Sequence, residues 1–422
     1  MTRPEIRVDR AADDERFLAT DQTVWFGEIS PSPTDTQLLG VPENQRFAVE
    51  VDDTDPGTYA GIYGVRPMEL AVPASTGRAS LVPCAGLTWV GVHPDHRRRG
   101  VLTAMLRHHV EQTHREGVAL SALHASEPAI YGRHGYGLAT QEYELSLGRG
   151  TELRAPGLEE AAKTIRTSFA TASDQGVAER LRECVLRSAP STPGVIIGAQ
   201  SFYSGIVDSS QRPEALRDNE PTRFLFAVRD GADVGVAVFR RHQKWEQARP
   251  KGKLEIFALE GDPATRLALL RRLLDFDLIA TVTVPRVGVD DPLWSWIGPR
   301  VADDLTFNDN LWIRIVDLPA ALPLRAYAAD CDVVVDVDDP AAPWQAGRWR
   351  IRIRGGEAVA ERTDDPADLA VPIAVLGSAY LGGANLIAMR RAGVLDELRS
   401  DAVAELSRAF RSDVAPYPAT GF

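Results

Sequence analysis

The chain of 422 residues is too long for a single hydrophobic core, so we expect two to four domains. Hydrophobic residues make up 44% of the sequence and charged residues 25%, which excludes a largely disordered chain. The formal net charge of -12 disfavours nucleic acid and anionic membranes as partners and suits cationic or neutral substrates.

The cysteines and the longest uncharged segment bear on the cell compartment. Cys84, Cys184 and Cys331 lie far apart and form no CxxC pair, so we expect neither disulfides nor a structural zinc site. The polar start of the chain lacks the apolar core of a signal peptide, and we expect a cytoplasmic protein. Residues 371–389 are uncharged, but their Pro and Gly residues predict a buried strand, a turn and a helix rather than a membrane span.

The first third of the chain predicts strands followed by a helix. Its strand-like segments are residues 46–51, 59–69, 87–92 and 118–125. An Asp/Gly/Pro turn separates the first two segments, as in a hairpin. A basic loop ends the third segment, and apolar residues then repeat at helical spacing from Val101 to the stop signal at Gly117.

The middle third repeats this order of elements. Its strand-like segments are residues 223–228, 234–240 and 253–259. Asp262 then predicts the start of a helix that ends near Phe276. The basic loop between strand and helix is missing. We therefore interpret residues 150–305 as a second, degenerate copy of the fold that residues 1–149 form.

The last third, residues 306–422, has a different pattern and is treated as a third domain. Its strand-like segments are residues 333–337, 348–354 and 357–362. Residues 348–354 alternate arginine with apolar residues, and the negative net charge favours an exposed sheet face over a nucleic-acid surface. Residues 396–410 predict an amphipathic helix. The tail beyond it contains two prolines and is long enough to extend roughly 35 Å.

The strongest functional signal is the loop HPDHRRRG at residues 93–100, where a strand ends and a helix begins. Amide groups at a helix N-terminus bind phosphates, Gly100 permits close approach, and three arginines add positive charge. A pyrophosphate site is therefore one interpretation, and a solvated basic turn is the other. Neither GxGxxG nor GxxxxGK[ST] is present, which weighs against dinucleotides and nucleoside triphosphates.

This loop resembles the acetyl-CoA-binding motif (Arg/Gln)-x-x-Gly-x-(Gly/Ala) of the GNAT acyltransferases. Arg97 and Gly100 occupy its first two fixed positions, whereas Leu102 departs from the third. Residues 126–136 resemble the short helix with Tyr, then Gly and an aromatic, of the same family, and residues 376–383 (LGSAYLGG) belong to a segment that resembles a sterol carrier protein domain. Together with the terminal Phe, these segments resemble the Eis (enhanced intracellular survival) aminoglycoside N-acetyltransferases.

The resemblance implies a mixed α/β (α+β) fold with tandem GNAT folds, the second degenerate, and a sterol-carrier-protein-like α+β domain whose tail reaches the active site. It implies an acetyl-CoA-dependent N-acetyltransferase acting on primary amines of polycationic small molecules such as aminoglycosides, by direct attack in a ternary complex. A homohexamer is implied, without nucleic-acid or membrane partners. No metal is expected, because the clustered histidines between His93 and His134 form no HExxH pattern and share no helical face.

The resemblance also assigns roles to residues. Phe422 supplies its terminal carboxylate as proton acceptor and Tyr131 is the proton donor; a frayed chain end and a packing aromatic are the alternatives. The implied coenzyme-binding residues are Val90, Gly91, Val92, Arg97, Arg98, Arg99, Gly100, Val101, Leu102, Thr103, Ser126 and Glu127. Trp89 matches a wall of the substrate pocket or is a core tryptophan. The segment with Trp25, Phe26 and Glu28 either lines that pocket or packs.

A second class of function stays open at this point. The third domain resembles lipid carriers, so the chain is alternatively a non-catalytic carrier or sensor that binds CoA or lipid. Catalysis is favoured because the first copy keeps the basic loop that the second copy lost.

Overall fold

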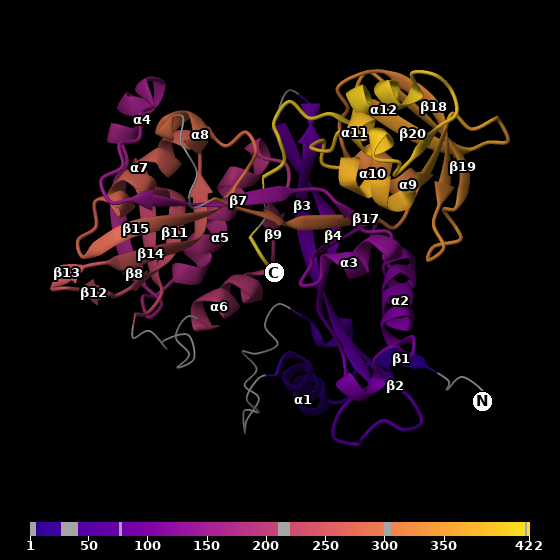
Figure 1. Cartoon of the computed structure of the whole chain (residues 1–422), viewed down its shortest axis with the longest axis horizontal. Helices are drawn as coiled ribbons and strands as arrows, with labels where there is room; N and C mark the ends of the chain where they lie inside the picture. The colour runs from indigo at the N-terminus through magenta and orange to yellow at the C-terminus, as the bar shows by residue number, and fades with distance from the viewer. Residues whose placement is uncertain (1–5, 27–40, 76–77, 210–219, 299–304, 418–419) are drawn as a thin grey trace.

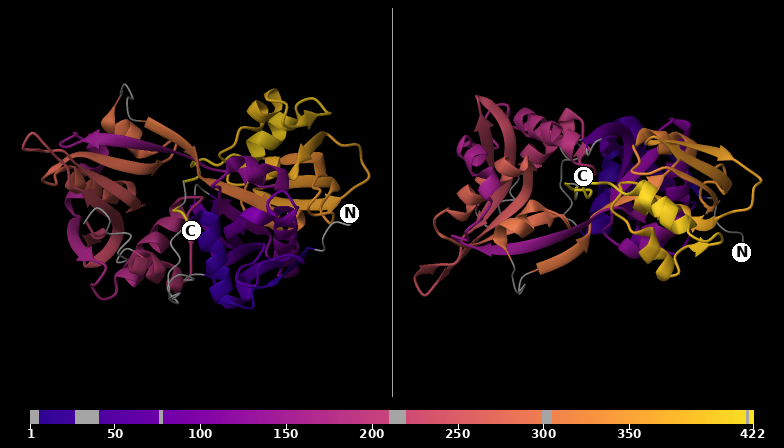
Figure 2. Two further views of the ribbon diagram at one scale, coloured as in Figure 1. Left: turned by 60° about the horizontal axis from the view of Figure 1, so that its bottom comes forward. Right: turned by 90° about the horizontal axis from the view of Figure 1, so that it is seen from above.

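The computed structural model describes residues 6–26, 41–75, 78–209, 220–298, 305–417 and 420–422. Figure 1 shows three lobes, each built on one β-sheet with helices packed against it. The third lobe, in orange and yellow, lies over one end of the first, and the second lies beside them. The end of the chain lies between the first two lobes in all three views (Figures 1 and 2).

The first sheet has the strand order β1-β2-β3-β4-β5-β17-β6, with β9 paired to β3. Its strands are β1 Arg7–Arg10, β2 Arg46–Glu50, β3 Gly61–Ala74, β4 Arg78–Val92, β5 Leu120–His124, β6 Gly137–Leu138, β9 Ile196–Ile197 and β17 Leu311–Ile315. Its helices are α1 Asp14–Trp25, α2 Val101–Arg115 and α3 Pro128–Tyr131. Helix α2 packs on this sheet because Val101, Met105 and Leu106, at helical spacing, are buried on one face.

The second sheet has the strand order β8-β10-β11-β14-β15-β7-β16. Its strands are β7 Gln141–Gly148, β8 Arg166–Thr171, β10 Arg223–Arg229, β11 Ala232–His242, β14 Gly252–Gly261, β15 Ile279–Val287 and β16 Leu305–Asp309, and a small hairpin joins β12 Trp245–Glu246 to β13 Arg249–Pro250. The helices of this lobe are α4 Glu159–Lys163, α5 Val177–Ser188, α6 Gln200–Ser209, α7 Pro263–Leu274 and α8 Pro292–Ile297.

The two sheets share one pairing pattern, which confirms the internal repeat predicted from the sequence. Each sheet begins with three antiparallel pairs, continues with one parallel pair, and ends with two antiparallel pairs. The parallel pair is β4 with β5 in the first sheet and β14 with β15 in the second. Helix α2 therefore corresponds to α7, since each connects the two parallel strands of its sheet.

The two sheets exchange one strand each. Strand β7 follows the first sheet along the chain but pairs with β15 and β16, and β17 follows the second sheet but pairs with β5 and β6. The division into residues 1–149, 150–305 and 306–422 stays a prediction. The two sheets cross both of its internal boundaries, because each contains strands from either side. The alternation of apolar residues identifies a strand but not the sheet edge that it joins.

The third lobe contains a sheet of order β20-β19-β18-β21-β22 and four short helices. Its elements are α9 Leu318–Ala321, β18 Cys331–Asp338, β19 Gly347–Arg354, β20 Glu357–Arg362, β21 Leu369–Pro372, α10 Ile373–Ala379, α11 Leu386–Arg391, β22 Asp396–Glu397 and α12 Ala402–Phe410. The helix predicted over residues 396–410 was too long, because Asp396 and Glu397 pair with β21 and α12 begins later. Among the described residues, no helix is long and apolar enough to cross a membrane.

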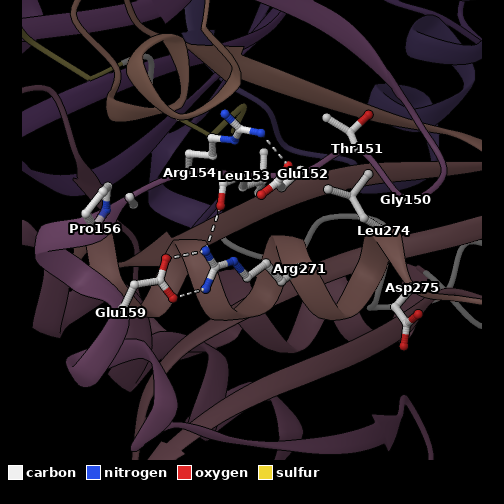
Figure 3. Close-up of a pocket in the computed structure, with 11 residues that line it drawn as sticks. Gly150, Thr151, Glu152, Leu153, Arg154, Pro156, Glu159, Arg271, Leu274 and Asp275 are labelled. Carbon is white, nitrogen blue, oxygen red and sulfur yellow. Dashed lines mark hydrogen bonds and ion pairs between the residues drawn. The ribbon is translucent and has the colours of Figure 1, made fainter.

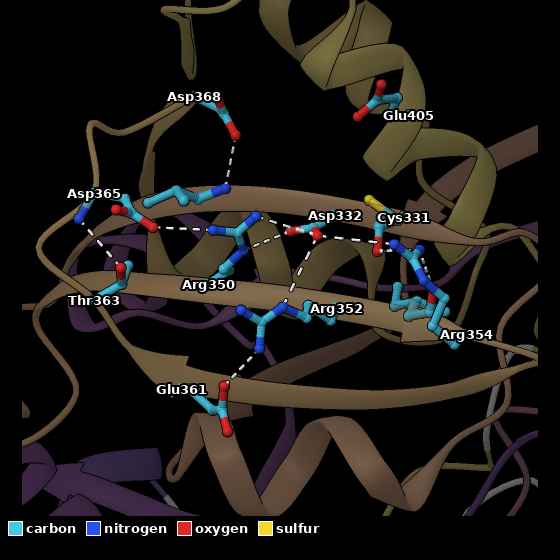
Figure 4. A network of polar contacts seen from close by, with 12 residues as sticks. Cys331, Asp332, Arg350, Arg352, Arg354, Glu361, Thr363, Asp365, Asp368 and Glu405 are labelled. Atoms are coloured by element: carbon cyan, nitrogen blue, oxygen red, sulfur yellow. Dashed lines mark hydrogen bonds and ion pairs between the residues drawn. The ribbon is translucent and has the colours of Figure 1, made fainter.

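The arginines of β19 lie on an exposed sheet face beside acidic side chains, as Figure 4 shows. Arg350 binds Asp332 at 2.7 Å and Asp365 at 2.9 Å, and Arg352 binds Glu361 at 2.7 Å. Because these cations are paired with carboxylates of the same face, the strand is an ion-paired surface. The strand therefore forms the exposed sheet face that the sequence predicted.

Candidate active site

A cleft of about 1000 Å³ lies between the end of β4, the start of α2 and the region of α3. It is lined by Val24, Trp25, Phe26, Val90, Gly91, Val92, Pro94, His96, Arg97, Arg98, Gly100, Val101, Leu102, Thr103, Arg107, Ser126, Glu127, Ile130, Tyr131, Arg133, His134, Pro340 and Ala341. The cleft thus brings together Tyr131 and every predicted coenzyme-binding residue except Arg99. Trp25 and Phe26 also line it, whereas Glu28 lies outside the described residues.

The cleft exists because two parallel strands separate. Among the described residues, β4 and β5 pair only at Ala85 with Ser121 and at Gly86 with Ala122. Strand β4 then continues to Val92 with β3 as its partner, so within the described part of the chain its main chain has no strand partner on the side of β5. A register shift falls in this stretch, where Trp89 has a φ of 57°. An extended ligand can add to such an exposed strand as a further strand would.

The start of α2 closes one end of the cleft with an uncapped helix N-terminus. Gly100 is the N-cap residue with a φ of 93°, a conformation that favours glycine. No side chain among the described residues caps this first turn. The partial positive charge of the helix end and the lining residues Arg97 and Arg98 together suit a pyrophosphate group.

The corresponding helix of the second copy is capped by an acidic side chain. The Asp262 carboxylate accepts a hydrogen bond from the Thr265 amide at 2.7 Å, and Pro263 opens the helix. This carboxylate occupies an amide group of the first turn that an anionic ligand would otherwise bind. The second copy thus lacks the basic loop, and the N-terminus of its corresponding helix α7 is already capped.

Tyr131 lies at the end of α3 in the wall of the cleft. Its side chain is buried, and its ring meets the Tyr136 ring edge to face with centroids 6.0 Å apart. Burial raises the pKa of Tyr131 to about 12, and the negative charge of Glu127 adds to this effect. The phenol is therefore protonated at neutral pH and available as a proton donor.

Phe422 lies where β4 and β5 separate. Its ring meets the His124 ring edge to face at 5.0 Å, and a Cβ atom added to Gly86 would come within 3.0 Å of its Cε2 atom. Gly86 is the last paired residue of β4 on this side, and His124 is the last residue of β5. The chain end is therefore packed and not frayed. Burial lowers the pKa of His124 to about 4, so this imidazole is neutral at pH 7.

Three predicted site residues are not among those that line the cleft. Arg99 forms a two-point ion pair with Asp53, with both N–O distances 2.9 Å. Trp89 packs against Phe17 of α1 with centroids 5.6 Å apart, which is the contact expected of a core tryptophan. Phe422 packs against His124 at the end of β5.

Sequence reasoning missed several lining residues. Arg133 and His134 lie inside the segment 126–136 that was singled out, and their basic character was the available signal. Pro340 and Ala341 come from the third lobe, and no local pattern predicts their place in the cleft. In the described part of the chain, no group of three His, Cys, Asp or Glu side chains could hold a metal ion.

A second cavity, of about 630 Å³, lies beside α7 and is shown in Figure 3. Its charged side chains are already paired. Arg271 binds Glu159 at 2.6 Å and the Leu153 carbonyl at 2.6 Å, and Arg154 binds Glu152 at 2.9 Å. These polar groups satisfy one another, so the cavity is a weaker candidate than the cleft.

Comparison with known proteins agrees with the fold and the cleft. Residues 6–139 match the acetyltransferase (GNAT) domain family, and residues 318–419 match the sterol carrier protein domain family. These matches, the duplicated mixed sheets and the cleft define a GNAT N-acetyltransferase with a sterol carrier domain. The fold class predicted from the sequence is thereby confirmed, and use of acetyl-CoA follows from the GNAT family.

Full-length relatives identify the family within this class. The chain is 37% identical over 401 residues to an uncharacterised N-acetyltransferase of Streptomyces avermitilis, with 94% of each chain covered. It is 31% identical over 397 residues to the N-acetyltransferase Eis of Mycobacterium tuberculosis, covering 92% of this chain and 91% of the other. The crystal structure of Eis1 from Mycobacterium abscessus matches with a TM-score of 0.77 and 25% identity, covering 99% of this chain and 100% of that chain. The chain belongs to the Eis family of N-acetyltransferases.

The contrast between the two helix N-termini gives a testable prediction. Replacing Gly100 by Asp places a carboxylate at the N-terminus of α2, and we expect the Kd for acetyl-CoA to rise about tenfold or more through charge repulsion. Gly100→Asn is the matched control, because it has the same shape and tolerates the backbone conformation without carrying the charge. Calorimetric titration of both variants measures the effect. Equal losses in the two variants would show that the charge at this helix end is unimportant.

Proposed function

We propose that the protein transfers the acetyl group of acetyl-CoA to primary amines of polycationic small molecules, aminoglycosides being the type. The acceptor amine attacks the thioester directly in a ternary complex, without a covalent enzyme intermediate. The observation that carries this proposal is one cleft that combines separated strands, an uncapped helix N-terminus and a buried, protonated tyrosine. A homohexameric assembly and a cytoplasmic location complete the proposal.

The chain's residues fit acetyl-CoA, which supplies the reactive thioester when bound. The first turn of α2, residues 101–103, with Arg97 and Arg98, would hold the pyrophosphate. The free side of β4 at residues 90–92 would hold the pantetheine arm by main-chain hydrogen bonds. Ser126 and Glu127 line the same cleft.

The proposed reaction needs one group that accepts a proton from the amine and another that donates a proton to the leaving thiolate. An alkylamine has a pKa near 10.4 and must lose a proton before it can attack a thioester. The Phe422 carboxylate would receive that proton through water, because a terminal carboxyl with a pKa of about 3.5 is a weak base. Tyr131 would be the proton donor to the leaving thiolate. Because its pKa of about 12 lies above that of a thiol, near 8.5, the phenol stays protonated and donates a hydrogen bond to the sulfur as negative charge develops there.

The entrance to the cleft suits a cationic acceptor. Trp25 and Phe26, at the end of α1, line the cleft and are 53% and 90% exposed, so their ring faces are open to a cation. These rings and the net charge of -12 support an acceptor with several amino groups.

A panel of acceptors tests this function. The purified protein is mixed with acetyl-CoA and either an aminoglycoside, a linear polyamine, a simple monoamine or an amine-free sugar, while free thiol and product mass are followed. We expect rapid thiol release with polyamino acceptors, slow release with the monoamine and none with the sugar. Tight binding of acetyl-CoA without amine-dependent thiol release would instead support the non-catalytic carrier.

The match to a sterol carrier domain is the observation that favours a carrier. In the third lobe, however, Trp349, Ile351 and Phe410 are buried within one continuous hydrophobic core. This part of the third lobe is therefore occupied by packed side chains. The structure therefore gives more support to catalysis in the first lobe than to lipid transport in the third.

A further inference from the structure

The second copy contains the same strand separation that forms the cleft in the first copy. Strands β14 and β15 pair in parallel from Gly252 to Glu255, and β14 then runs on to Gly261 beside β11. A register shift with β11 falls at Phe257, as the corresponding shift with β3 falls at Trp89 in the first copy. The second copy therefore has the backbone of a coenzyme cleft.

The chain's own groups occupy this second cleft. The Arg286 guanidinium donates a hydrogen bond to the Phe257 carbonyl, and the Tyr417 hydroxyl donates one to the Leu259 carbonyl at 3.4 Å. In the first copy, the matching stretch of β4 pairs, among the described residues, with β3 alone. With Asp262 capping α7 as well, both the strand edge and the helix end of the second cleft are satisfied internally.

Tyr417 belongs to the C-terminal tail, which several further contacts hold on the second copy. The Tyr417 amide donates to the Pro193 carbonyl at 2.7 Å, and the Ala415 amide donates to Asp290 at 3.0 Å. The Arg266 guanidinium lies 5.6 Å from the centre of the Tyr417 ring. Arg266 is itself fixed by a buried ion pair of 2.7 Å with Asp291.

A further contact between the tail and the second copy lies close to the chain end. Thr420 hydrogen-bonds the Glu260 side chain, which is buried at the end of β14. Phe422 is two residues further on, so an extended chain of roughly 3.3 Å per residue leaves its carboxylate within about 7 Å of this anchor. A tail attached only at the end of α12, residue 410, could instead sweep over roughly 40 Å.

We infer that the second copy, having lost its coenzyme loop, serves as a dock for the C-terminal tail and sets the position of Phe422 in the first copy. Tyr417, Arg266 and Glu260 are then positioning residues, not catalytic ones. The inference rests on the proposed function only for the catalytic role of the Phe422 carboxylate. Holding a reacting group in place raises its effective concentration, which is how docking would increase the rate.

Tyr417→Ala tests the dock, and Tyr417→Phe is the conservative control because it keeps the ring over Arg266. Carboxypeptidase digestion followed by intact mass measures how accessible the chain end is. We expect Tyr417→Ala to lose Phe422 about tenfold faster than the native chain, and Tyr417→Phe to resemble the native chain. The Kd for acetyl-CoA should stay within about twofold and kcat should fall about tenfold, because the cleft itself is unchanged.

A chain that ends at Gly421 separates the dock from the catalytic role of Phe422. In that shortened chain, Tyr417→Ala should lower kcat no further, since the group that the dock positions is gone. If the shortened chain keeps full activity while Tyr417→Ala still frees the tail, the dock stands and the role of Phe422 fails. Unchanged release of Phe422 in Tyr417→Ala would overturn the dock itself.

A second variant keeps the test valid if Tyr417→Ala does not fold. Gly194 has a φ of 96°, and a Cβ atom there would lie 2.4 Å from the Tyr417 carbonyl oxygen. Gly194→Ala should therefore displace the tail at Tyr417 through a steric clash. Carboxypeptidase should then release Phe422 faster, as in Tyr417→Ala. Native-like release from a folded Gly194→Ala protein would count against the dock.

Discussion

Replacing Tyr131 by Phe is expected to lower kcat about a hundredfold or more, because general acid catalysis typically contributes that much to a rate. The substitution removes a single hydroxyl and keeps the ring that packs against Tyr136 in the wall of the cleft. The Kd for acetyl-CoA should therefore change by no more than about twofold. Steady-state kinetics with a saturating amine, together with calorimetric titration of the coenzyme, measure the two quantities.

The dependence of the rate on pH adds an independent check on Tyr131. Burial raises its pKa to about 12, so the phenol keeps its proton across neutral and moderately alkaline solution. In the native enzyme, kcat/KM should rise with pH as the acceptor amine loses its proton. It should not fall through ionisation of Tyr131 below about pH 11, one unit under the raised pKa.

Tyr136→Phe is the matched control, since Tyr136 is the neighbouring buried tyrosine and its hydroxyl bonds Ser121 at 2.8 Å beneath the sheet. Losing that hydrogen bond should cost about 1 kcal/mol of stability and leave kcat nearly unchanged. If folded Tyr131→Phe retained the native rate, Tyr131 would not be the acid. Equal kinetic losses in both variants would point to disturbed packing instead.

Local patterns in the sequence were sufficient for the part of the site that is continuous along the chain. The strand 87–92, the basic loop and the helix from Val101 follow one another, so periodicity and a single Gly located them. The cleft accordingly contains Arg97, Gly100 and most of the predicted neighbours. The side chain of Arg99 pairs with Asp53 instead of lining the cleft, and a loop sequence alone does not show that Asp53 lies opposite.

The remaining features depend on contacts between distant segments, which no local pattern encodes. The exchange of β7 and β17, the cleft residues Pro340 and Ala341, and the dock for Tyr417 all join parts of the chain separated by more than a hundred residues. A hydrophobic strand pairs equally well with several edges, so its partner is decided by the whole fold. Terminal residues also carry little periodic signal, which is why the packed position of Phe422 followed from resemblance and not from pattern.

A buried ion pair joins the first and third lobes beside the hydrophobic core that they share. The Arg314 guanidinium of β17 lies 2.8 Å from the Asp339 carboxylate, and the two side chains are 0% and 1% exposed. The Gln345 amide donates to the same carboxylate at 2.7 Å. Asp339 immediately precedes Pro340 and Ala341, so the pair fixes the part of the third lobe that lines the cleft.

Asp339→Ala should therefore destabilise the protein by about 3–5 kcal/mol, because it leaves the Arg314 charge buried without a partner. The Kd for acetyl-CoA should also rise, since one wall of the cleft loses its fixed position. Asp332→Ala is the matched control: Asp332 binds Arg350 at 2.7 Å, but on the partly exposed face of Figure 4. Its loss should cost less than about 1 kcal/mol. Urea unfolding of the two variants compares these costs, and equal costs would show that the buried pair does not hold the lobes together.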